Sequence, residues 1–171
     1  DLDRDGDMDV LLTNGDVIDT EKIRPYQGVQ WLENTGGFPF VHHELTIMPG
    51  VHRALADDLD GDGDLDIAAV ALLPDFVLDT EDRRTLGSVV WLEQTGPLQF
   101  TRHTLETVDC HHAALALGDF DGDGDLDLAV GDYLLERENP ISPWLSIWLN
   151  QQVSRGATTS SPGFCPSRGQ R

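Results

Sequence analysis

Residues 58–66 read Asp58-Leu59-Asp60-Gly61-Asp62-Gly63-Asp64-Leu65-Asp66, and this acidic stretch decides the fold prediction. The same pattern, Asp-x-Asp-x-Asp-Gly-Asp-x-Asp, occurs at residues 1–9 and 119–127, so the three copies begin 57 and 61 residues apart. Self-similarity at such an interval is typical of a repeat architecture, in which each repeat forms one supersecondary unit.

Each acidic stretch has the spacing of a calcium loop. Ca²⁺ binds six to eight oxygens at about 2.3–2.6 Å, and a glycine at the sixth position allows the loop to turn sharply. The expected ligands are the carboxylates at positions 1, 3, 5 and 9 and the backbone carbonyl at position 7. These positions hold Asp1, Asp3, Asp5, Asp7 and Asp9, then Asp58, Asp60, Asp62, Asp64 and Asp66, then Asp119, Asp121, Asp123, Asp125 and Asp127. The sequence therefore predicts up to three Ca²⁺ ions.

The EF-hand is the main alternative for such a loop. Its twelfth position carries a bidentate Glu at the start of a helix. Here that position holds Leu12, Ala69 or Val130, none of which can bind a metal. Short apolar runs rich in β-formers follow the loops, so each loop is expected to lead into a strand.

The repeat extends beyond the acidic loops. Residues 29–36, Val-Gln-Trp-Leu-Glu-Asn-Thr-Gly, match residues 89–96, Val-Val-Trp-Leu-Glu-Gln-Thr-Gly, and residues 146–150 begin a third copy. A Phe/His segment at residues 40–45 likewise matches residues 100–105. A unit of about 60 residues thus predicts four strands: one before the loop, one after it, the Trp-Leu strand and the Phe/His strand.

Four antiparallel strands make one blade of a β-propeller. The strands that flank the loops, such as Ala113–Leu117, are almost continuously apolar. We therefore expect both of their faces to be buried between neighbouring sheets.

Together these motifs resemble the FG-GAP/VCBS class of calcium-binding repeats, found in integrin α-subunit heads and in secreted bacterial proteins. The resemblance covers residues 1–150, and the first copy departs from the full loop motif only at Arg4 and Met8. It implies an all-β fold of about two and a half blades of an incomplete propeller, with blade boundaries near residues 50 and 110. The remaining blades of a parent chain are the partner that it implies.

Residues 151–171 differ sharply in composition from the rest of the chain. They contain three arginines and no acid, and are rich in Ser, Thr, Gly and Pro. Such a segment buries too little apolar surface to offset its ordering entropy, so we expect it to be disordered.

The overall charge limits the classes of partner. With 31 acidic and 11 basic residues the net charge is −20, and this potential argues against binding nucleic acid or an anionic membrane surface. The longest apolar run, residues 67–73, is far shorter than the roughly 20 residues that a membrane-spanning helix needs. Loops of this type suit the calcium concentration outside the cell, which predicts an extracellular, cell-surface or periplasmic location.

A ligand face is expected opposite the calcium loops, where the long connectors lie. The candidate ligand-binding residues there are His52, Arg53, His111, His112 and Trp144. We expect a non-catalytic scaffold for recognition of a protein or carbohydrate, or for adhesion, because the chain lacks a nucleophile elbow, a zincin motif and a phosphate-binding Gly-rich loop. The alternative is an accessory propeller domain of a glycan-degrading enzyme such as a polysaccharide lyase.

The repeated aromatic and histidine positions are expected to be structural. His43 and His103 occupy equivalent places in their repeats, as repeated packing positions do. Trp31, Trp91 and Trp148 lie within repeated strands, which favours a packing role over a sugar-binding platform.

Overall fold

The computed structural model describes residues 1–18, 21–74, 85–107, 110–133, 144–151 and 163–167. Within these ranges the chain is all-β and contains no α-helix. None of the described segments is a helix that could cross a membrane. The strands are β1 (Val10–Thr13), β2 (Gly28–Glu33), β3 (Val41–Ile47), β4 (Val51–Asp57), β5 (Asp66–Ala71), β6 (Val89–Gly96), β7 (Gln99–Glu106), β8 (His112–Gly118), β9 (Asp127–Asp132), β10 (Leu145–Gln151) and β11 (Gly163–Ser167).

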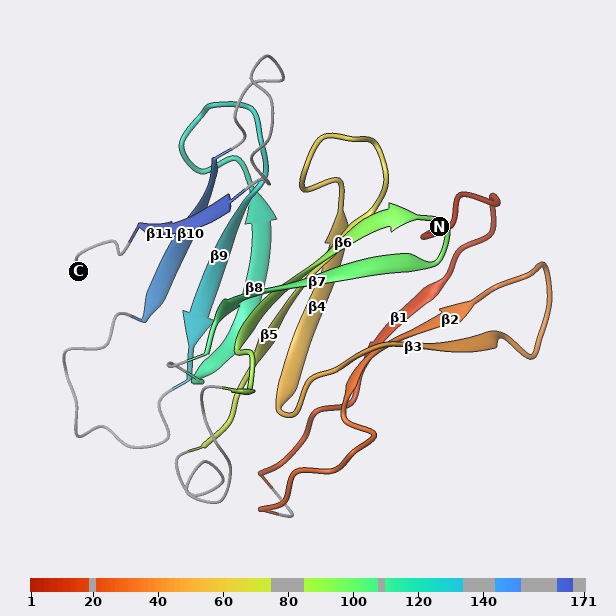
Figure 1. Cartoon of the computed structure of the whole chain (residues 1–171), viewed down its shortest axis with the longest axis horizontal. Coiled ribbons are helices and arrows are strands. Elements are labelled where there is room, and N and C mark those ends of the chain that lie inside the picture. Colours follow the sequence, from red (N-terminus) through yellow and green to blue (C-terminus); the bar gives the residue numbers. More distant parts are fainter. Residues whose placement is uncertain (19–20, 75–84, 108–109, 134–143, 152–162, 168–171) are drawn as a thin grey trace.

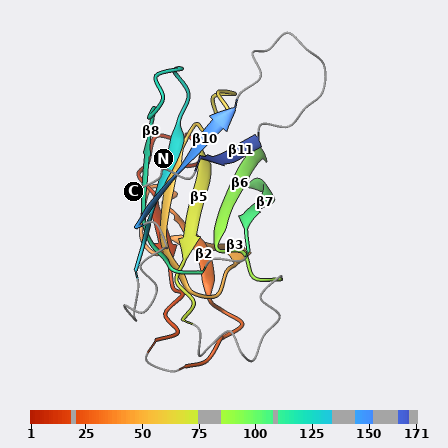
Figure 2. The ribbon, with the colours of Figure 1, turned by 90° about the vertical axis from the view of Figure 1, so that its left-hand side faces the viewer.

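The strands form three antiparallel sheets that follow one another along the chain. Sheet 1 has the order β1-β2-β3, sheet 2 the order β4-β5-β6-β7 and sheet 3 the order β8-β9-β10-β11. The sheets lie face to face in this order, as both ribbon views show (Figures 1 and 2). Sheet 2 confirms the predicted four-strand unit, because its strands lie before the acidic loop, after it, at the Trp-Leu segment and at the Phe/His segment.

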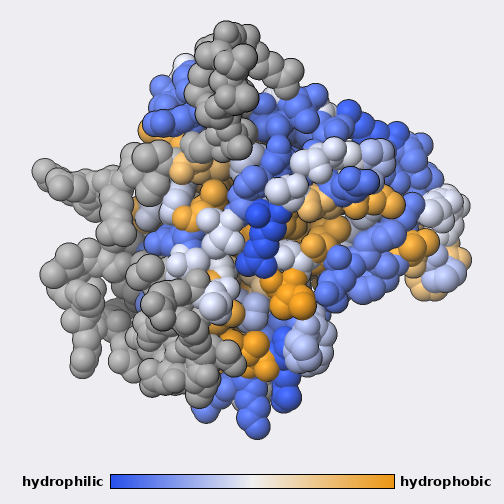
Figure 3. All heavy atoms as spheres, viewed as in Figure 1, coloured by the Kyte–Doolittle hydropathy of each residue, from blue (hydrophilic) through white to orange (hydrophobic). Residues whose placement is uncertain are grey.

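In the described part of the chain, two apolar cores lie between the sheets. One joins sheets 1 and 2 around Val29, Trp31 and Ile67, and the other joins sheets 2 and 3 around Val70 and Trp91. Strand β5 contributes to both cores and is buried throughout, because its successive side chains point to opposite faces. Elsewhere on the surface, apolar residues lie in patches among hydrophilic ones (Figure 3).

The prediction that Ala113–Leu117 is buried on both faces was wrong. This segment lies in β8, where Leu115 packs into the core with sheet 2 but Ala114 and Ala116 are exposed. Among the described residues, sheet 3 packs against another sheet only through the face that it turns toward sheet 2.

The prediction of a disordered tail was wrong for residues 163–167. These residues form β11, which pairs with β10 in antiparallel register, and Gln151 belongs to β10. Phe164 packs edge-on against Trp91 with a centroid separation of 5.6 Å. Composition missed this strand because the open edge of β10 supplies backbone partners that no local pattern reveals. Residues 152–162 and 168–171 lie outside the described residues.

The third Trp strand is shifted by one residue relative to the first two. Trp31 pairs with Leu11 and Trp91 with Ala68, each the second residue after the ninth aspartate of its loop, whereas Trp148 pairs with Leu128, the first residue after that aspartate. A shift of one residue turns a side chain to the other face of the sheet. Trp148 therefore points back toward sheet 2 and is buried in the core between sheets 2 and 3.

Candidate metal centres

The acidic loops lie at one end of the sheets, and the long connector between β1 and β2 lies at the other (Figure 1). The first loop precedes β1, the second joins β4 to β5 and the third joins β8 to β9. In the described part of the chain, three groups of acidic side chains bring carboxylate oxygens within 4.8 Å of one another. They are Asp1, Asp3 and Asp5; Asp58, Asp60 and Asp62; and Asp119, Asp121 and Asp127.

Local backbone geometry folds each loop around its carboxylates. In the second loop the Asp62 N–H donates to Asp60 Oδ1 at 3.0 Å, and the Asp64 N–H donates to Asp62 Oδ1 at 2.8 Å. The sixth-position glycine has φ of +100° at Gly63, and of +99° and +97° in the other two copies. This left-handed region strongly favours glycine, which explains why the residue recurs.

The ninth carboxylate of each loop joins the loop to the Trp strand of the same sheet. Asp66 Oδ1 accepts the Gln94 N–H at 2.7 Å. The same bond occurs in the other sheets, from Asn34 N to Asp9 Oδ1 at 2.8 Å and from Asn150 N to Asp127 Oδ1 at 2.7 Å. The second oxygens of Asp9 and Asp127 accept the backbone N–H of the loop's second residue, Leu2 or Phe120. The ninth position was predicted only as a metal ligand, and sequence carried no signal of this clamp.

Burial and mutual repulsion disfavour the charged form of several loop carboxylates. Burial, with a smaller contribution from Asp60 and Asp62, raises the pKa of Asp66 to about 6. Burial and the neighbouring Asp62 and Asp58 raise the pKa of Asp60. The pKa of Asp121 is raised in the same way. A cation among these oxygens would reverse the repulsion that contributes to these shifts.

The donor set fits a hard cation such as Ca²⁺. All side-chain donors are carboxylate oxygens, which Ca²⁺ prefers. Asp58 Oδ1 is buried yet has no hydrogen-bond partner, whereas the Asp66 carboxylate interacts with the Trp91 side chain. Buried polar atoms are usually satisfied, so the unpartnered Asp58 oxygen within a carboxylate cluster fits a metal ligand.

The grouping differs in detail from the predicted ligand set. The first two groups contain positions 1, 3 and 5, whereas the third contains Asp127 in place of Asp123. The side chain of Asp64, predicted to offer only its carbonyl, forms an ion pair with Arg4 of the first loop at 3.3 Å. The carbonyl ligands Asp7, Asp64 and Asp125 stay a prediction.

The five candidate ligand-binding residues do not form one site. His52, Arg53 and Trp144 are exposed, and His111 is half-buried. His112 is only 2% exposed, so its assignment to an open ligand face was wrong. Its Nδ1 lies 2.6 Å from Asp132 Oδ1, and its Nε2 lies 3.3 Å from Glu106 Oε2. These two carboxylates hold the ring inside the junction of sheets 2 and 3.

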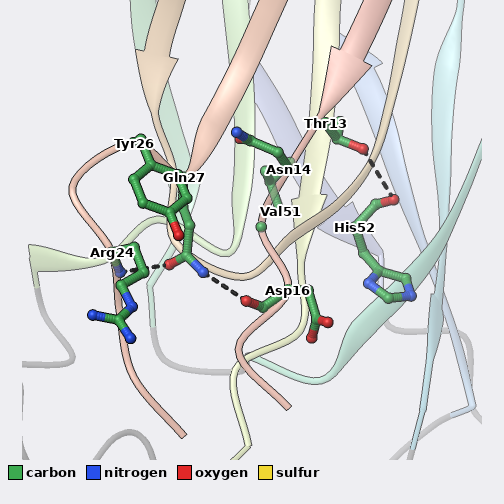
Figure 4. A pocket seen from close by; sticks show the side chains of 9 residues that line it. Thr13, Asn14, Asp16, Arg24, Tyr26, Gln27, Val51 and His52 are labelled. Carbon is green, nitrogen blue, oxygen red and sulfur yellow. Dashed lines mark hydrogen bonds between the residues drawn. The ribbon is translucent and has the colours of Figure 1, made fainter. Parts of the chain in front are cut away.

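A hollow of about 420 Å³ lies at the connector end, between the end of β1 and the start of β4 (Figure 4). It is lined by Thr13, Asn14, Gly15, Asp16, Arg24, Tyr26, Gln27, Val51 and His52. Gln27 shapes the wall, since its Nε2 donates to the Asp16 carbonyl at 2.7 Å and its Oε1 accepts the Arg24 N–H at 2.9 Å. Of the lining residues only His52 was a sequence candidate. Tyr26 and Arg24 were missed because they lie in a connector without a motif.

The repeated histidines have the structural role that was predicted. His43 stacks on Trp31 at 4.7 Å, and His103 stacks on Trp91 at 4.6 Å. Each histidine Nε2 also lies 2.6 Å from a glutamate oxygen of the Trp strand. Trp31, Trp91 and Trp148 are all buried, so none of them offers a platform for a sugar.

Comparison with known proteins gives one match. Residues 1–69 match the family model described as FG-GAP-like repeat. This segment contains the first two acidic loops, the whole of sheet 1, β4 and the beginning of β5. No curated protein and no solved structure matches the chain.

Proposed function

We propose, from the match of residues 1–69 to the FG-GAP-like repeat family model, that the chain is a calcium-binding, non-catalytic segment of a β-propeller. In this proposal it belongs to a secreted or cell-surface protein and supports recognition of a protein or carbohydrate, or adhesion. The observation that carries the proposal is the convergence of carboxylate oxygens within 4.8 Å in three equivalent loops.

The sheet arrangement supports the propeller. Three sheets with the same sequential strand order lie face to face and share apolar cores, as successive blades do. A closed propeller has about four to eight blades, so three sheets account for part of a ring. Further blades are the partner that this architecture requires.

Calcium would act as a structural clamp. The residues that would hold it are the carboxylates of the three groups, completed by ninth-position carboxylates and seventh-position carbonyls. Ca²⁺ supplies positive charge that neutralises crowded aspartates, and it carries no reaction here. Because the ninth carboxylates also bond to the Trp strands, an occupied loop would hold three neighbouring strands of one sheet in place.

The hollow at the connector end supports a recognition role at the end opposite the metals. Tyr26 is exposed there, and Arg24, Asp16 and His52 place polar and charged groups around it. An aromatic ring with convergent polar groups is a common means of holding a small ligand. An exposed aromatic ring such as Tyr26 can also stack on a sugar. An accessory propeller domain of a glycan-degrading enzyme is therefore the second candidate.

Isothermal titration of chelator-treated protein with Ca²⁺, followed in parallel by circular dichroism, tests the proposal. We expect close to three ions per chain and a gain in thermal stability. Asp62→Ala should remove one site, while Asp57→Asn, which removes a charge just outside the loop but can still accept the Asp58 N–H, should keep all of them. A folded chain that binds no Ca²⁺, or an unchanged stoichiometry in Asp62→Ala, would refute the ligand assignment.

A further inference from the structure

The hollow at the connector end is built on a fixed polar frame. Gln27 is 2% exposed, and its amide holds the Asp16 carbonyl on one side and the Arg24 N–H on the other. Asn14 Oδ1 accepts the Gly28 N–H at 2.9 Å, so the two ends of the connector are joined as well. A site that is held in place before its ligand arrives loses less conformational freedom on binding.

Gly15 brings this connector against the start of β4. A Cβ at this position would lie 2.0 Å from the backbone nitrogen of Val51, so any side chain here would force the backbone apart. Across the same junction the Thr13 hydroxyl donates to the His52 carbonyl at 3.4 Å. The hollow therefore lies where sheets 1 and 2 meet, and its shape depends on a residue without a side chain.

The exposed side chains around the hollow are not used by the fold. They are Asp16, Arg24, Tyr26 and His52. In Figure 4 the Tyr26 and His52 rings lie on opposite sides, with Asp16 between them. One oxygen of Asp16 accepts the Ile18 N–H, whereas the Arg24 guanidinium forms no hydrogen bond or ion pair with any residue that the structure describes. An acceptor, a donor and an aromatic ring are thus available to a ligand.

The opposite charges of Asp16 and Arg24 favour a neutral ligand with hydroxyl groups. An anion attracted by the guanidinium would also meet the carboxylate, and a cation attracted by the carboxylate would also meet the guanidinium. A carboxylate only accepts hydrogen bonds and a guanidinium only donates them, whereas a hydroxyl group does both. A neutral polyol therefore satisfies both side chains. The net charge of −20 further disfavours a polyanion.

We propose that the hollow binds one neutral pyranose unit of a glycan. The C–H face of the sugar ring packs on Tyr26, while its hydroxyls donate to the Asp16 carboxylate and accept from the Arg24 guanidinium. The volume of about 420 Å³ lies within the range of small-ligand sites, roughly 300–1,000 Å³. This inference rests on the recognition role proposed above and names its ligand class.

Saturation-transfer difference NMR of the full chain in Ca²⁺ tests the proposal with small probes of matched shape. The probes are the methyl glycosides of glucose, galactose and mannose, the corresponding anionic uronic acids and the corresponding cationic amino sugars. We expect the neutral member of at least one series to bind with a dissociation constant of roughly 1 mM, as suits a ligand of so few atoms. Both charged members of that series should bind more weakly.

Removal of the aromatic ring should weaken this binding. Tyr26→Ala should raise the dissociation constant of the neutral glycoside roughly tenfold, and Tyr26→Phe should restore most of the affinity, because it keeps the ring. Tyr133→Ala is the matched control, since Tyr133 is the chain's other tyrosine, is 51% exposed and lies outside the hollow. It should bind the glycoside like the wild type.

A second variant decides the question if Tyr26→Ala fails to fold by circular dichroism. Arg24→Ala removes the guanidinium but keeps the backbone N–H that Gln27 Oε1 accepts, so the frame of the hollow is retained. It should weaken binding of the neutral glycoside severalfold, because one donor to the sugar hydroxyls is lost. Unchanged binding in a folded Arg24→Ala would contradict the placement of the sugar.

Three results would overturn the proposal: no binding of any neutral glycoside, tighter binding of a charged member than of its neutral counterpart, or equal binding by Tyr26→Ala and the wild type. Calcium titration of the same samples separates this failure from a failure of the metal sites. A chain that binds Ca²⁺ but no glycoside leaves the calcium-binding scaffold in place and the hollow to a protein partner. A chain that binds the glycoside but no Ca²⁺ supports the sugar site and refutes only the metal assignment.

Discussion

Substitution Asp66→Asn separates the two roles of the ninth loop carboxylate. The side-chain oxygen of Asn can still accept the Gln94 N–H that Asp66 accepts at 2.7 Å, so the clamp to the Trp strand is preserved. The negative charge is lost. The variant should therefore change the response to calcium without breaking the connection between the loop and the strand.

The magnitude follows from the raised pKa of Asp66. Burial, assisted by Asp60 and Asp62, raises that pKa from 3.8 to about 6. Each pKa unit corresponds to about 1.4 kcal/mol, and solvent screening near the loop reduces the realised cost to roughly 1–2 kcal/mol. Without metal, Asp66→Asn should raise the free energy of unfolding by this amount, or the melting temperature by roughly 2–4 °C per kcal/mol.

Calcium should reverse the order of stability. At a free concentration of 100 times the dissociation constant, one site stabilises the folded state by about 2.7 kcal/mol. If Asp66→Asn loses this contribution at the second site, the wild type should become more stable than the variant by about 1 kcal/mol. Thermal melts of the wild type and of Asp66→Asn, each in chelator and in Ca²⁺, give the four melting temperatures that this comparison needs.

Two outcomes would refute the reasoning. If Asp66→Asn is less stable than the wild type in chelator, the charge on the buried carboxylate does not destabilise the metal-free folded state. If calcium stabilises both proteins equally, the charge of Asp66 does not contribute to binding. Asp57→Asn removes a carboxylate next to the loop but outside the cluster, and should leave both melting temperatures and the calcium response unchanged.

Three further predictions follow from the contacts. His103→Ala should lower the free energy of unfolding by about 1–2 kcal/mol in a denaturant titration, because it removes the stack on Trp91 and a short hydrogen bond, while calcium stoichiometry stays the same. Asn150→Ala should cost about 1–3 kcal/mol in the same assay, since its buried Nδ2 donates to the Leu59 carbonyl of the neighbouring loop at 2.7 Å. The metal-free protein should lose stability as the pH rises from about 4 to about 6, because the pKa of Asp66 is higher in the folded state than its ordinary 3.8. In saturating Ca²⁺ the melting temperature should instead rise with pH over this range, since protons compete with the metal for the carboxylates.

Equivalent positions in sheet 1 supply controls for the first two of these. His43→Ala should reproduce the loss seen in His103→Ala, since the stacking distance and the hydrogen bond are almost the same. Asn34→Ala should cost less than Asn150→Ala, because its side chain donates to Met8 O at an exposed site. A larger loss in Asn34→Ala would contradict the importance of the contact between neighbouring loops. A metal-free melting temperature that rises between pH 4 and 6 would contradict the role of Asp66.

Features determined by local pattern were predictable from the sequence. The acidic loops depend on aspartates at alternate positions and on a glycine such as Gly63, whose left-handed backbone follows from sterics alone. The strands were predictable because apolar runs of this length bounded by turns favour β-structure. The structural role of His103 was also predictable, because an internal repeat compares equivalent environments within one chain.

Features that depend on contacts between distant segments were decided only by the tertiary structure. The clamp from Asp66 to Gln94 spans 28 residues, and no spacing rule relates these two positions. Strand β11 exists because β10 has an open edge, although its own composition favours disorder. Burial of His112 depends on Asp132, its partner in the β8–β9 pairing, and on Glu106, which meets it only once sheets 2 and 3 pack together. Local pattern specifies which elements form, whereas packing against residues far along the chain determines which side chains are buried, which bind and which faces are left exposed.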